Sequence, residues 1–226
     1  MDSIHSPRIK ICCILSRQEA QLAIHEGASA VGLVGAMPSG PGPIPDELIA
    51  DIARSVPPPI ATFLLTSRQS VREIVAHHGR VHTSAIQLVD ELREGTYEEL
   101  RQSLPGIKIV QVIHVVGTQS IDAAIAVSGN VDALLLDSGR PDLPVKELGG
   151  TGRRHDWKIS RQIRESVQIP IFLAGGLTPD NVRGAIEEVA PFGVDVCSGV
   201  RTNGLLDPYK LARFVHAVKM AAFEEP

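Results

Sequence analysis

The chain has 226 residues, and 22 Lys and Arg against 26 Asp and Glu give it a formal charge of −4 at pH 7. Apolar residues make up 43 % of the sequence and aromatic residues 4 %, a composition that argues against a disordered chain. The apolar runs, such as residues 171–177, are too short for a membrane span. Nucleic-acid binding is disfavoured, because the chain is slightly acidic and has few aromatic side chains for base stacking.

Eight short runs rich in β-branched residues or leucine are predicted to form strands. Most are apolar throughout, which is typical of parallel strands covered on both faces. In chain order the predicted strands are residues 9–14, 30–34, 60–65, 85–88, 107–114, 131–136, 169–174 and 194–197. A stretch with helical periodicity follows each of them, at residues 16–26, 46–55, 68–77, 97–103, 120–127, 158–165, 179–189 and 208–221.

These eight strand–helix units predict one (β/α)8 barrel domain, a TIM barrel, over residues 1–226. Each unit takes about 28 residues, which is at the compact end for this fold. A doubly wound open sheet is the competing architecture, but the helix after every strand and the count of eight favour the barrel. Residues 1–7 are expected to form a flexible N-terminal tail.

Two of the connections from a strand to a helix are long. Residues 35–45 contain three Gly and four Pro, and residues 137–156 are Gly-rich and charged without a helical period. Long ordered loops in a compact domain usually carry function. In barrels the functional site lies at the carboxyl ends of the strands, so we expect the site there.

Small residues follow the last two predicted strands. Gly175 and Gly176 come after the seventh strand, and Ser198 and Gly199 come after the eighth. Such turns let backbone N–H groups approach an anion at the usual phosphate site of barrels, although they are also consistent with glycines that only make tight turns. Gly152 belongs to a Gly-rich loop that could close over the same anion.

The first predicted strand carries a lysine and two adjacent cysteines. Alternation puts Lys10 and Cys12 on one face, and the polar lysine suggests that this face points into the barrel, so that Cys13 would face the helices. A thiol near a lysine can act as a base or nucleophile, but free cysteines are often only buried small hydrophobic residues. Asp137, after the sixth strand, is either a loop cap or a catalytic acid. Asp195, inside the apolar eighth strand, needs a charged partner or a function.

The cysteine count and the first residues indicate the compartment. Three cysteines are few and odd in number, which suggests a reducing environment. The first seven residues lack the apolar stretch of a signal peptide. We therefore expect a soluble cytosolic protein. The sequence contains no residue spacing typical of metal ligands, so no metal site is predicted.

Five motifs together resemble the phosphoribosylanthranilate isomerase family. They occur in the order seen in that family, and the resemblance extends from about residue 8 to about residue 218. The motifs are KIC at 10–12, LLDS at 135–138, GGTG at 149–152 with DW at 156–157, LAGGL at 173–177 with NV at 181–182, and VDVCSGV at 194–200.

The resemblance implies an enzyme of tryptophan biosynthesis that performs an Amadori rearrangement. N-(5-phosphoribosyl)anthranilate would become 1-(2-carboxyphenylamino)-1-deoxyribulose 5-phosphate, with Cys12 as the base and Asp137 as the acid that opens the sugar ring. The family uses no metal and no organic cofactor. We expect a small phosphosugar substrate, no nucleic acid or membrane partner, and a monomer or homodimer.

Other site residues follow from the same resemblance. Asp195 would lie near the aminoaryl group, and Lys10 is a further candidate for a substrate contact. The phosphate would bind to backbone amides around Gly152, Gly175, Gly176, Ser198 and Gly199.

Several positions depart from the family pattern. Cys13 replaces the glycine after the KIC motif, and Gly42 stands where the family has an arginine that binds the anthranilate carboxylate. Arg201, beside the phosphate turns, is our candidate to take over that carboxylate, against the alternative of an ordinary surface charge. Other candidates for this role are Arg140, Arg153 and Arg154.

Two other functions remain open at this point. The chain could isomerise a related phosphosugar with a different aglycone by the same mechanism. Alternatively, it could be a non-catalytic binder of phosphoribosyl ligands. A binder would need the phosphate site but not Cys12 and Asp137, so the presence of both favours an isomerase.

Overall fold

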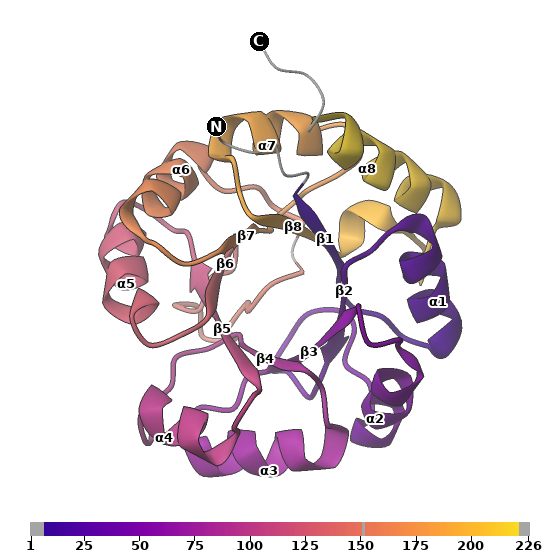
Figure 1. The fold of residues 1–226 in the computed structure, drawn as a ribbon. Helices are drawn as coiled ribbons and strands as arrows, with labels where there is room; N and C mark the ends of the chain where they lie inside the picture. The colour runs from indigo at the N-terminus through magenta and orange to yellow at the C-terminus, as the bar shows by residue number, and fades with distance from the viewer. Residues whose placement is uncertain (1–6, 151, 222–226) are drawn as a thin grey trace.

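The structure, a computed structural model, describes residues 7–150 and 152–221 of the chain. Eight parallel strands close into a barrel in chain order, with helices around the outside (Figure 1). This arrangement confirms the predicted (β/α)8 barrel and excludes the open sheet. The strands are β1 (Arg8–Ile11), β2 (Ala30–Val34), β3 (Ala61–Thr66), β4 (Ala85–Leu88), β5 (Lys108–His114), β6 (Ala133–Asp137), β7 (Ile171–Leu173) and β8 (Gly193–Val196).

One α-helix follows each barrel strand among the described residues. These are α1 (Arg17–Glu26), α2 (Asp46–Ser55), α3 (Val71–Val81), α4 (Tyr97–Ser103), α5 (Gln119–Ser128), α6 (Trp157–Ser166), α7 (Val182–Val189) and α8 (Pro208–Ala221). A short 3-10 helix, η1 (Ser198–Val200), and a small hairpin of β9 (Arg201–Thr202) and β10 (Leu205–Leu206) lie between β8 and α8. The hairpin was not predicted. Within the described ranges no helix is long and apolar enough to cross a membrane.

Helix α7 begins three residues later than predicted. The sequence predicted a start at residue 179. Instead, Asn181 Oδ1 accepts a hydrogen bond from the backbone N–H of Thr178 at 2.8 Å, and Asn181 Nδ2 donates to the carbonyl of Gly176 at 2.9 Å. These bonds hold residues 178–181 in a turn after β7, so the helix begins only at Val182.

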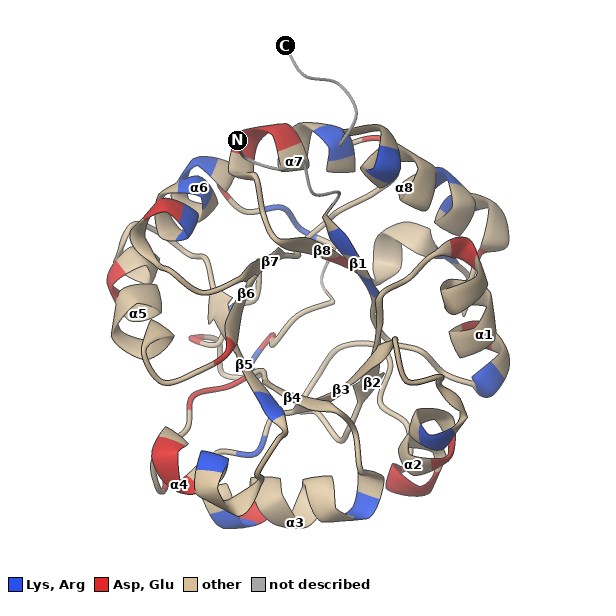
Figure 2. Ribbon diagram, in the orientation of Figure 1, with Lys and Arg blue, Asp and Glu red and all other residues tan. Residues whose placement is uncertain are grey.

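The apolar side chains form two layers, one on each side of the barrel wall. In β4, for example, Ile86 and Leu88 pack outward against the helices, whereas Ala85 points into the barrel. This alternation repeats along the strands, as expected for a sheet covered on both faces. Charged residues of both signs lie mainly on the outer helices and in the loops (Figure 2).

An ion pair lies inside the barrel between its first and last strands. Lys10 of β1 is directly opposite Asp195 of β8 in the register, and its Nζ lies 2.9 Å from Asp195 Oδ1. The ammonium also lies 5.4 Å from the ring centroid of Phe63 on β3. Lys10 is completely buried. The prediction that its face of β1 points into the barrel is therefore confirmed.

Glu19 on α1 connects this helix to the β9–β10 hairpin. Its carboxylate accepts hydrogen bonds from the backbone N–H groups of Leu15 and Leu206, each at 3.0 Å, and pairs with the guanidinium of Arg201 at 2.9 Å. Burial would raise the pKa of Glu19, but Arg201 and the two N–H donors outweigh it and lower the pKa. The folded chain therefore favours the charged carboxylate.

We predict that Glu19→Gln lowers the free energy of unfolding at neutral pH by about 2–4 kcal/mol, because it leaves the buried Arg201 without its counter-charge. The carboxylate stabilises the fold above the pKa of glutamate in the unfolded chain, about 4.3. This contribution is lost as the pH falls through the lowered pKa of the folded state. The difference between the wild type and the variant should therefore shrink in acid, as measured by urea unfolding across that range.

Glu187→Gln is the matched control. Glu187 lies on the exposed surface of α7 and pairs with Arg183 at 2.7 Å one helical turn away. Its replacement should cost no more than about 0.5 kcal/mol. Equal losses for the two variants would show that Glu19 is only another surface charge.

Candidate active site

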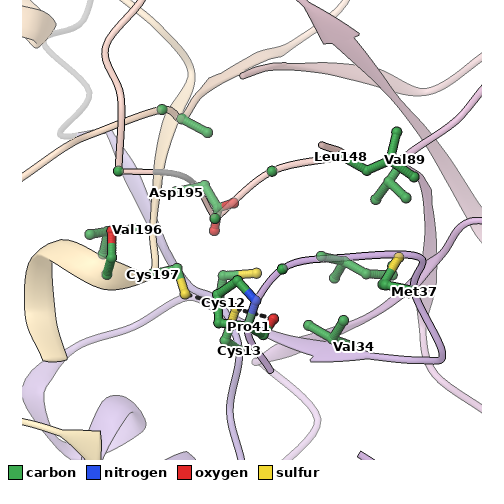
Figure 3. Close-up of a pocket in the computed structure, with 18 of the residues that line it drawn as sticks. Cys12, Cys13, Val34, Met37, Pro41, Val89, Leu148, Asp195, Val196 and Cys197 are labelled. Atoms are coloured by element: carbon green, nitrogen blue, oxygen red, sulfur yellow. Dashed lines mark hydrogen bonds between the residues drawn. The ribbon is translucent and has the colours of Figure 1, made fainter. Parts of the chain in front are cut away.

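A pocket opens at the carboxyl ends of the barrel strands (Figure 3). This is the end at which the sequence predicts the site. The ends of β1, β2, β3, β4, β7 and β8 contribute to its wall, together with the long loops after β2 and β6. The lining residues are Cys12, Cys13, Val34, Met37, Ser39, Gly40, Pro41, Leu65, Val89, Leu148, Gly149, Gly150, Gly152, Ala174, Gly175, Gly176, Leu177, Asp195, Val196, Cys197 and Ser198.

Cys12 lies immediately after β1, in the wall of the pocket. Its backbone N–H donates to the carbonyl of Val196 at 2.8 Å, which extends the pairing of β1 with β8. A Cβ atom at Gly32 on β2 would lie 2.9 Å from the Cys12 sulfur and 3.1 Å from Lys10 Nζ. The missing side chain of Gly32 thus leaves the space in which this thiol and this ammonium lie.

Lys10 and Asp195 differ in their access to the pocket. Asp195 lines the pocket, whereas Lys10 does not line it and contacts it only through its ion pair with Asp195. Burial alone would lower the pKa of Lys10, but the Asp195 carboxylate and the Cys12 thiol outweigh burial and raise this pKa. Lys10 therefore holds its positive charge inside the barrel.

Asp137 ends β6 and lies just behind two glycines of the pocket wall. A Cβ atom at Gly149 would lie 2.6 Å from Asp137 Oδ2, and one at Gly175 would lie 3.2 Å from Oδ1. Oδ1 also accepts a hydrogen bond from the backbone N–H of Ser138 at 2.7 Å. Burial raises the pKa of Asp137 despite that N–H donor and the nearby His114. The raised pKa favours the protonated acid, which can donate a proton.

His155 also lies at the site, which the sequence did not predict. Its Nε2 hydrogen-bonds to Ser160 Oγ at 2.7 Å, and its Nδ1 is buried without a hydrogen-bond partner among the described residues. A Cβ atom at Gly175 would lie 3.0 Å from this Nδ1, close to Asp137. Burial lowers the pKa of His155 to about 4, so its imidazole is neutral near pH 7. A lone histidine before a helix gave no sequence signal for this position.

The glycine-rich turns converge on one side of the pocket. Gly152, Gly175, Gly176 and Ser198 line it. A Cβ atom at Gly176 would lie 2.8 Å from the carbonyl oxygen of Gly152, so the two turns come into backbone contact. Gly199 does not line the pocket but packs behind it, where a Cβ atom would lie 1.9 Å from the carbonyl oxygen of Leu177. Thr151 of the GGTG motif lies outside the described residues.

The two long loops touch across the mouth of the pocket. Ser39 Oγ, from the loop after β2, donates to the carbonyl of Lys146 in the loop after β6 at 2.6 Å. A Cβ atom at Gly150 would lie 2.5 Å from Pro41 Cδ. Because this contact leaves no room for a side chain, Gly150 allows the loops to meet.

Cys13 does not face the helices, so that expectation was wrong. The strand ends at Ile11, and Cys13 adopts a left-handed conformation with φ of 60°. This turn carries its side chain into the pocket wall, where its sulfur donates to the carbonyl of Pro41 at 3.7 Å and lies 2.8 Å from the sulfur of Cys197. Strand alternation fails here because it applies only while the backbone remains extended.

The structure does not bring Arg201 to the pocket, contrary to the expected substrate contact. Its side chain is 7 % exposed, and its guanidinium donates to Glu19, to the carbonyl of Gly204 at 2.9 Å and to the carbonyl of Cys13. The other three arginine candidates have partners of their own. Arg140 pairs with Asp142, and Arg153 with Glu147, while Arg154 stacks on the Trp157 ring.

The side of the pocket near the loop after β2 is apolar. Its wall there consists of Val34, Met37, Pro41, Leu65 and Leu148, and in the described part of the chain the lining contains no Lys or Arg. Within the same residues no group of three His, Cys, Asp or Glu side chains could hold a metal ion. The pocket therefore combines an apolar region, a glycine-rich region, and acidic and thiol groups between them.

Comparison with known proteins relates this chain to an enzyme family. The family model for N-(5'-phosphoribosyl)anthranilate isomerase matches residues 9–217. The chain is 38 % identical to N-(5'-phosphoribosyl)anthranilate isomerase 2 of Methanosarcina mazei, over 96 % of each chain. It is 35 % identical to the isomerase of Haloarcula marismortui, over 95 % of this chain and 97 % of that protein.

Solved structures agree with these relatives. The phosphoribosylanthranilate isomerase of Thermotoga maritima is 29 % identical with a TM-score of 0.79, and the match covers 95 % of this chain and 99 % of that one. A phosphoribosylanthranilate isomerase in complex with reduced 1-(o-carboxyphenylamino)-1-deoxyribulose 5-phosphate is 27 % identical with a TM-score of 0.77 and the same coverage. This chain belongs to the N-(5'-phosphoribosyl)anthranilate isomerase family.

Proposed function

We propose that this chain converts N-(5'-phosphoribosyl)anthranilate into 1-(2-carboxyphenylamino)-1-deoxyribulose 5-phosphate, with Cys12 as the general base and Asp137 as the general acid. The observation that carries these roles is that Cys12 lines the pocket while Asp137 lies directly behind its wall, beside Gly149 and Gly175. Cys12 follows β1 and Asp137 ends β6, three strands away around the barrel. An acid and a base on separate strands can act on different atoms of one sugar.

The reaction requires only proton transfers by these groups. Asp137 gives its proton to the furanose ring oxygen, and the ring opens to a Schiff base between C1 and the amine nitrogen. Cys12 then removes the proton from C2, and the resulting enolamine rearranges to the ketone. Oxidation at C2 balances reduction at C1 within one molecule. The raised pKa of the buried Asp137 supports its role, because the acid must begin the cycle protonated.

The remaining groups bind the substrate in this proposal. The glycine-rich turns around Gly152, Gly176 and Ser198 offer backbone N–H groups to the phosphate. Asp195 accepts a hydrogen bond from the substrate amine, and Lys10 acts through Asp195 by holding its carboxylate in place. The apolar wall near Met37 takes the aryl ring. The substrate is thus a small phosphosugar, and no further cofactor has a role in these steps.

The replacement of the family arginine by Gly42 defines the aryl end of this pocket. Gly42 has φ of 95°, and a Cβ atom there would lie 2.7 Å from the Cβ of Cys13. An arginine at this position would thus be both strained and crowded by Cys13. The aryl carboxylate is therefore expected to lie at the open mouth of the pocket, where water rather than a guanidinium solvates it.

Cys12→Ser and Asp137→Asn are each expected to reduce kcat by about 10²–10⁴-fold, the usual contribution of one general acid or base. Neither should change the folded structure, which circular dichroism and thermal unfolding would check. The wild-type gene should restore growth of a tryptophan auxotroph that lacks this isomerase, and either variant should not. Purified proteins would then be assayed with the anthranilate substrate.

Asp142→Asn is the control in the same loop, because Asp142 is exposed and pairs only with Arg140 in the described contacts. It should keep wild-type turnover. Wild-type turnover in Cys12→Ser or Asp137→Asn would refute the assigned role. A wild-type protein that neither restores growth nor turns over this substrate, yet isomerises another phosphoribosylamine, would instead favour a different aglycone.

A second prediction concerns the aryl end. Gly42→Arg should not lower KM for the anthranilate substrate, and it should destabilise the fold by about 1–3 kcal/mol more than Gly106→Arg, since only Gly42 is crowded. Gly106 is a suitable control because its φ of 82° carries the same backbone strain with open space around its Cβ. Thermal unfolding and steady-state kinetics test both points. A lower KM without loss of stability would show that this loop accepts the arginine of the family.

A further inference from the structure

The pocket wall contains two thiols that the proposed isomerisation does not use. Cys13 follows β1 and Cys197 follows β8, and they are 184 residues apart in sequence. Their sulfur atoms nevertheless lie 2.8 Å apart in a hydrogen bond (Figure 3). This distance is well within van der Waals contact of two sulfurs, so a bond between them needs little movement.

We propose that Cys13 and Cys197 form a reversible disulfide in the wall of the pocket, with hydrogen peroxide as the oxidant class. The two side chains meet because β1 and β8 are neighbours in the closed barrel, and because the backbone turns directly after each of these strands. Cys12 is placed differently, with its sulfur beside Gly32 and Lys10. A bond between the adjacent Cys12 and Cys13 would be strained.

The surroundings divide the pair into a nucleophile and a resolving thiol. The contact with Cys13 lowers the pKa of the Cys197 thiol and burial opposes this, while the Arg201 guanidinium adds to the lowering. Hydrogen bonds with Cys12 and Cys197, together with burial, raise the pKa of Cys13. Cys197 is also the more exposed of the two. Cys197 is thus the thiolate that meets an oxidant first.

The chemistry then balances in two steps. The Cys197 thiolate attacks one oxygen of hydrogen peroxide, the O–O bond breaks, and with one proton the products are a sulfenic acid and water. The sulfur of Cys13 then attacks the sulfur of that sulfenic acid and displaces hydroxide. The hydroxide takes the proton of the Cys13 thiol and leaves as a second water molecule. Two electrons pass from the two sulfurs to the peroxide. A dithiol reductant reverses the change by thiol–disulfide exchange.

The disulfide would change two contacts of the pocket. Cys13 would lose the thiol proton that it donates to the carbonyl of Pro41. The loop after β2 would therefore lose its hydrogen bond to the turn that follows β1. At the same time the ends of β1 and β8 would become covalently linked. A link that closes so long a loop restricts the unfolded chain strongly and stabilises the fold.

The test treats the reduced full chain with hydrogen peroxide, blocks the remaining thiols by alkylation, and maps peptides without reduction. We expect one cross-link between the peptides of Cys13 and Cys197, with two hydrogen atoms lost and Cys12 alkylated. The melting temperature should rise on the order of 10 °C and return with dithiothreitol.

Serine variants identify the partners. Cys12→Ser should still form the cross-link, whereas Cys13→Ser and Cys197→Ser should not form it or show the rise in melting temperature. The wild-type mass map alone decides the matter if a variant fails to fold. No cross-link in the oxidised wild type, or one that includes Cys12, would overturn the proposal. The disulfide does not depend on the isomerase roles, because neither of its cysteines has one.

Discussion

The ion pair between Lys10 and Asp195 is the interaction on which the site depends. It joins the first and last strands of the barrel, where closure requires the two ends of the chain to meet. An isolated buried ammonium would cost several kcal/mol, and removing one partner of such a pair typically costs about 3–5 kcal/mol. The space that Lys10 takes beside Phe63 is left free by Gly32, and that space also fixes where Cys12 lies.

Much of this arrangement was predictable from local sequence. Apolar strands followed by periodic helices predict the barrel, and alternation in β1 places Lys10 and Cys12 inside. The position of the pocket follows from strand direction, because parallel strands present all their carboxyl ends at one rim. The aliphatic wall near Met37 is consistent with the scarcity of aromatic residues in the chain and with the Pro- and Gly-rich loop after β2. These inferences rest on the alternation of strand residues and the periodicity of helix residues, patterns that can be recognised within a few residues of sequence.

The features that sequence could not predict depend on contacts between distant segments. Arg201 was expected at the pocket, but its guanidinium forms an ion pair with Glu19, which lies 182 residues earlier in the sequence. Cys13 was expected to face outward, but a left-handed turn reverses its direction, and no pattern of apolar residues encodes such a turn. The ring of His155 and the carboxylate of Asp137 both lie beside Gly175, where a side chain would collide with them.

The order of strands in the barrel also has a consequence for synthesis. Lys10 leaves the ribosome 185 residues before its counter-ion Asp195. At ordinary translation rates this interval lasts roughly 10–40 s. During that time β1 has an unpaired edge and an uncompensated lysine facing what will become the barrel interior. The ion pair that joins the first and last strands can therefore form only after β8 has been synthesised.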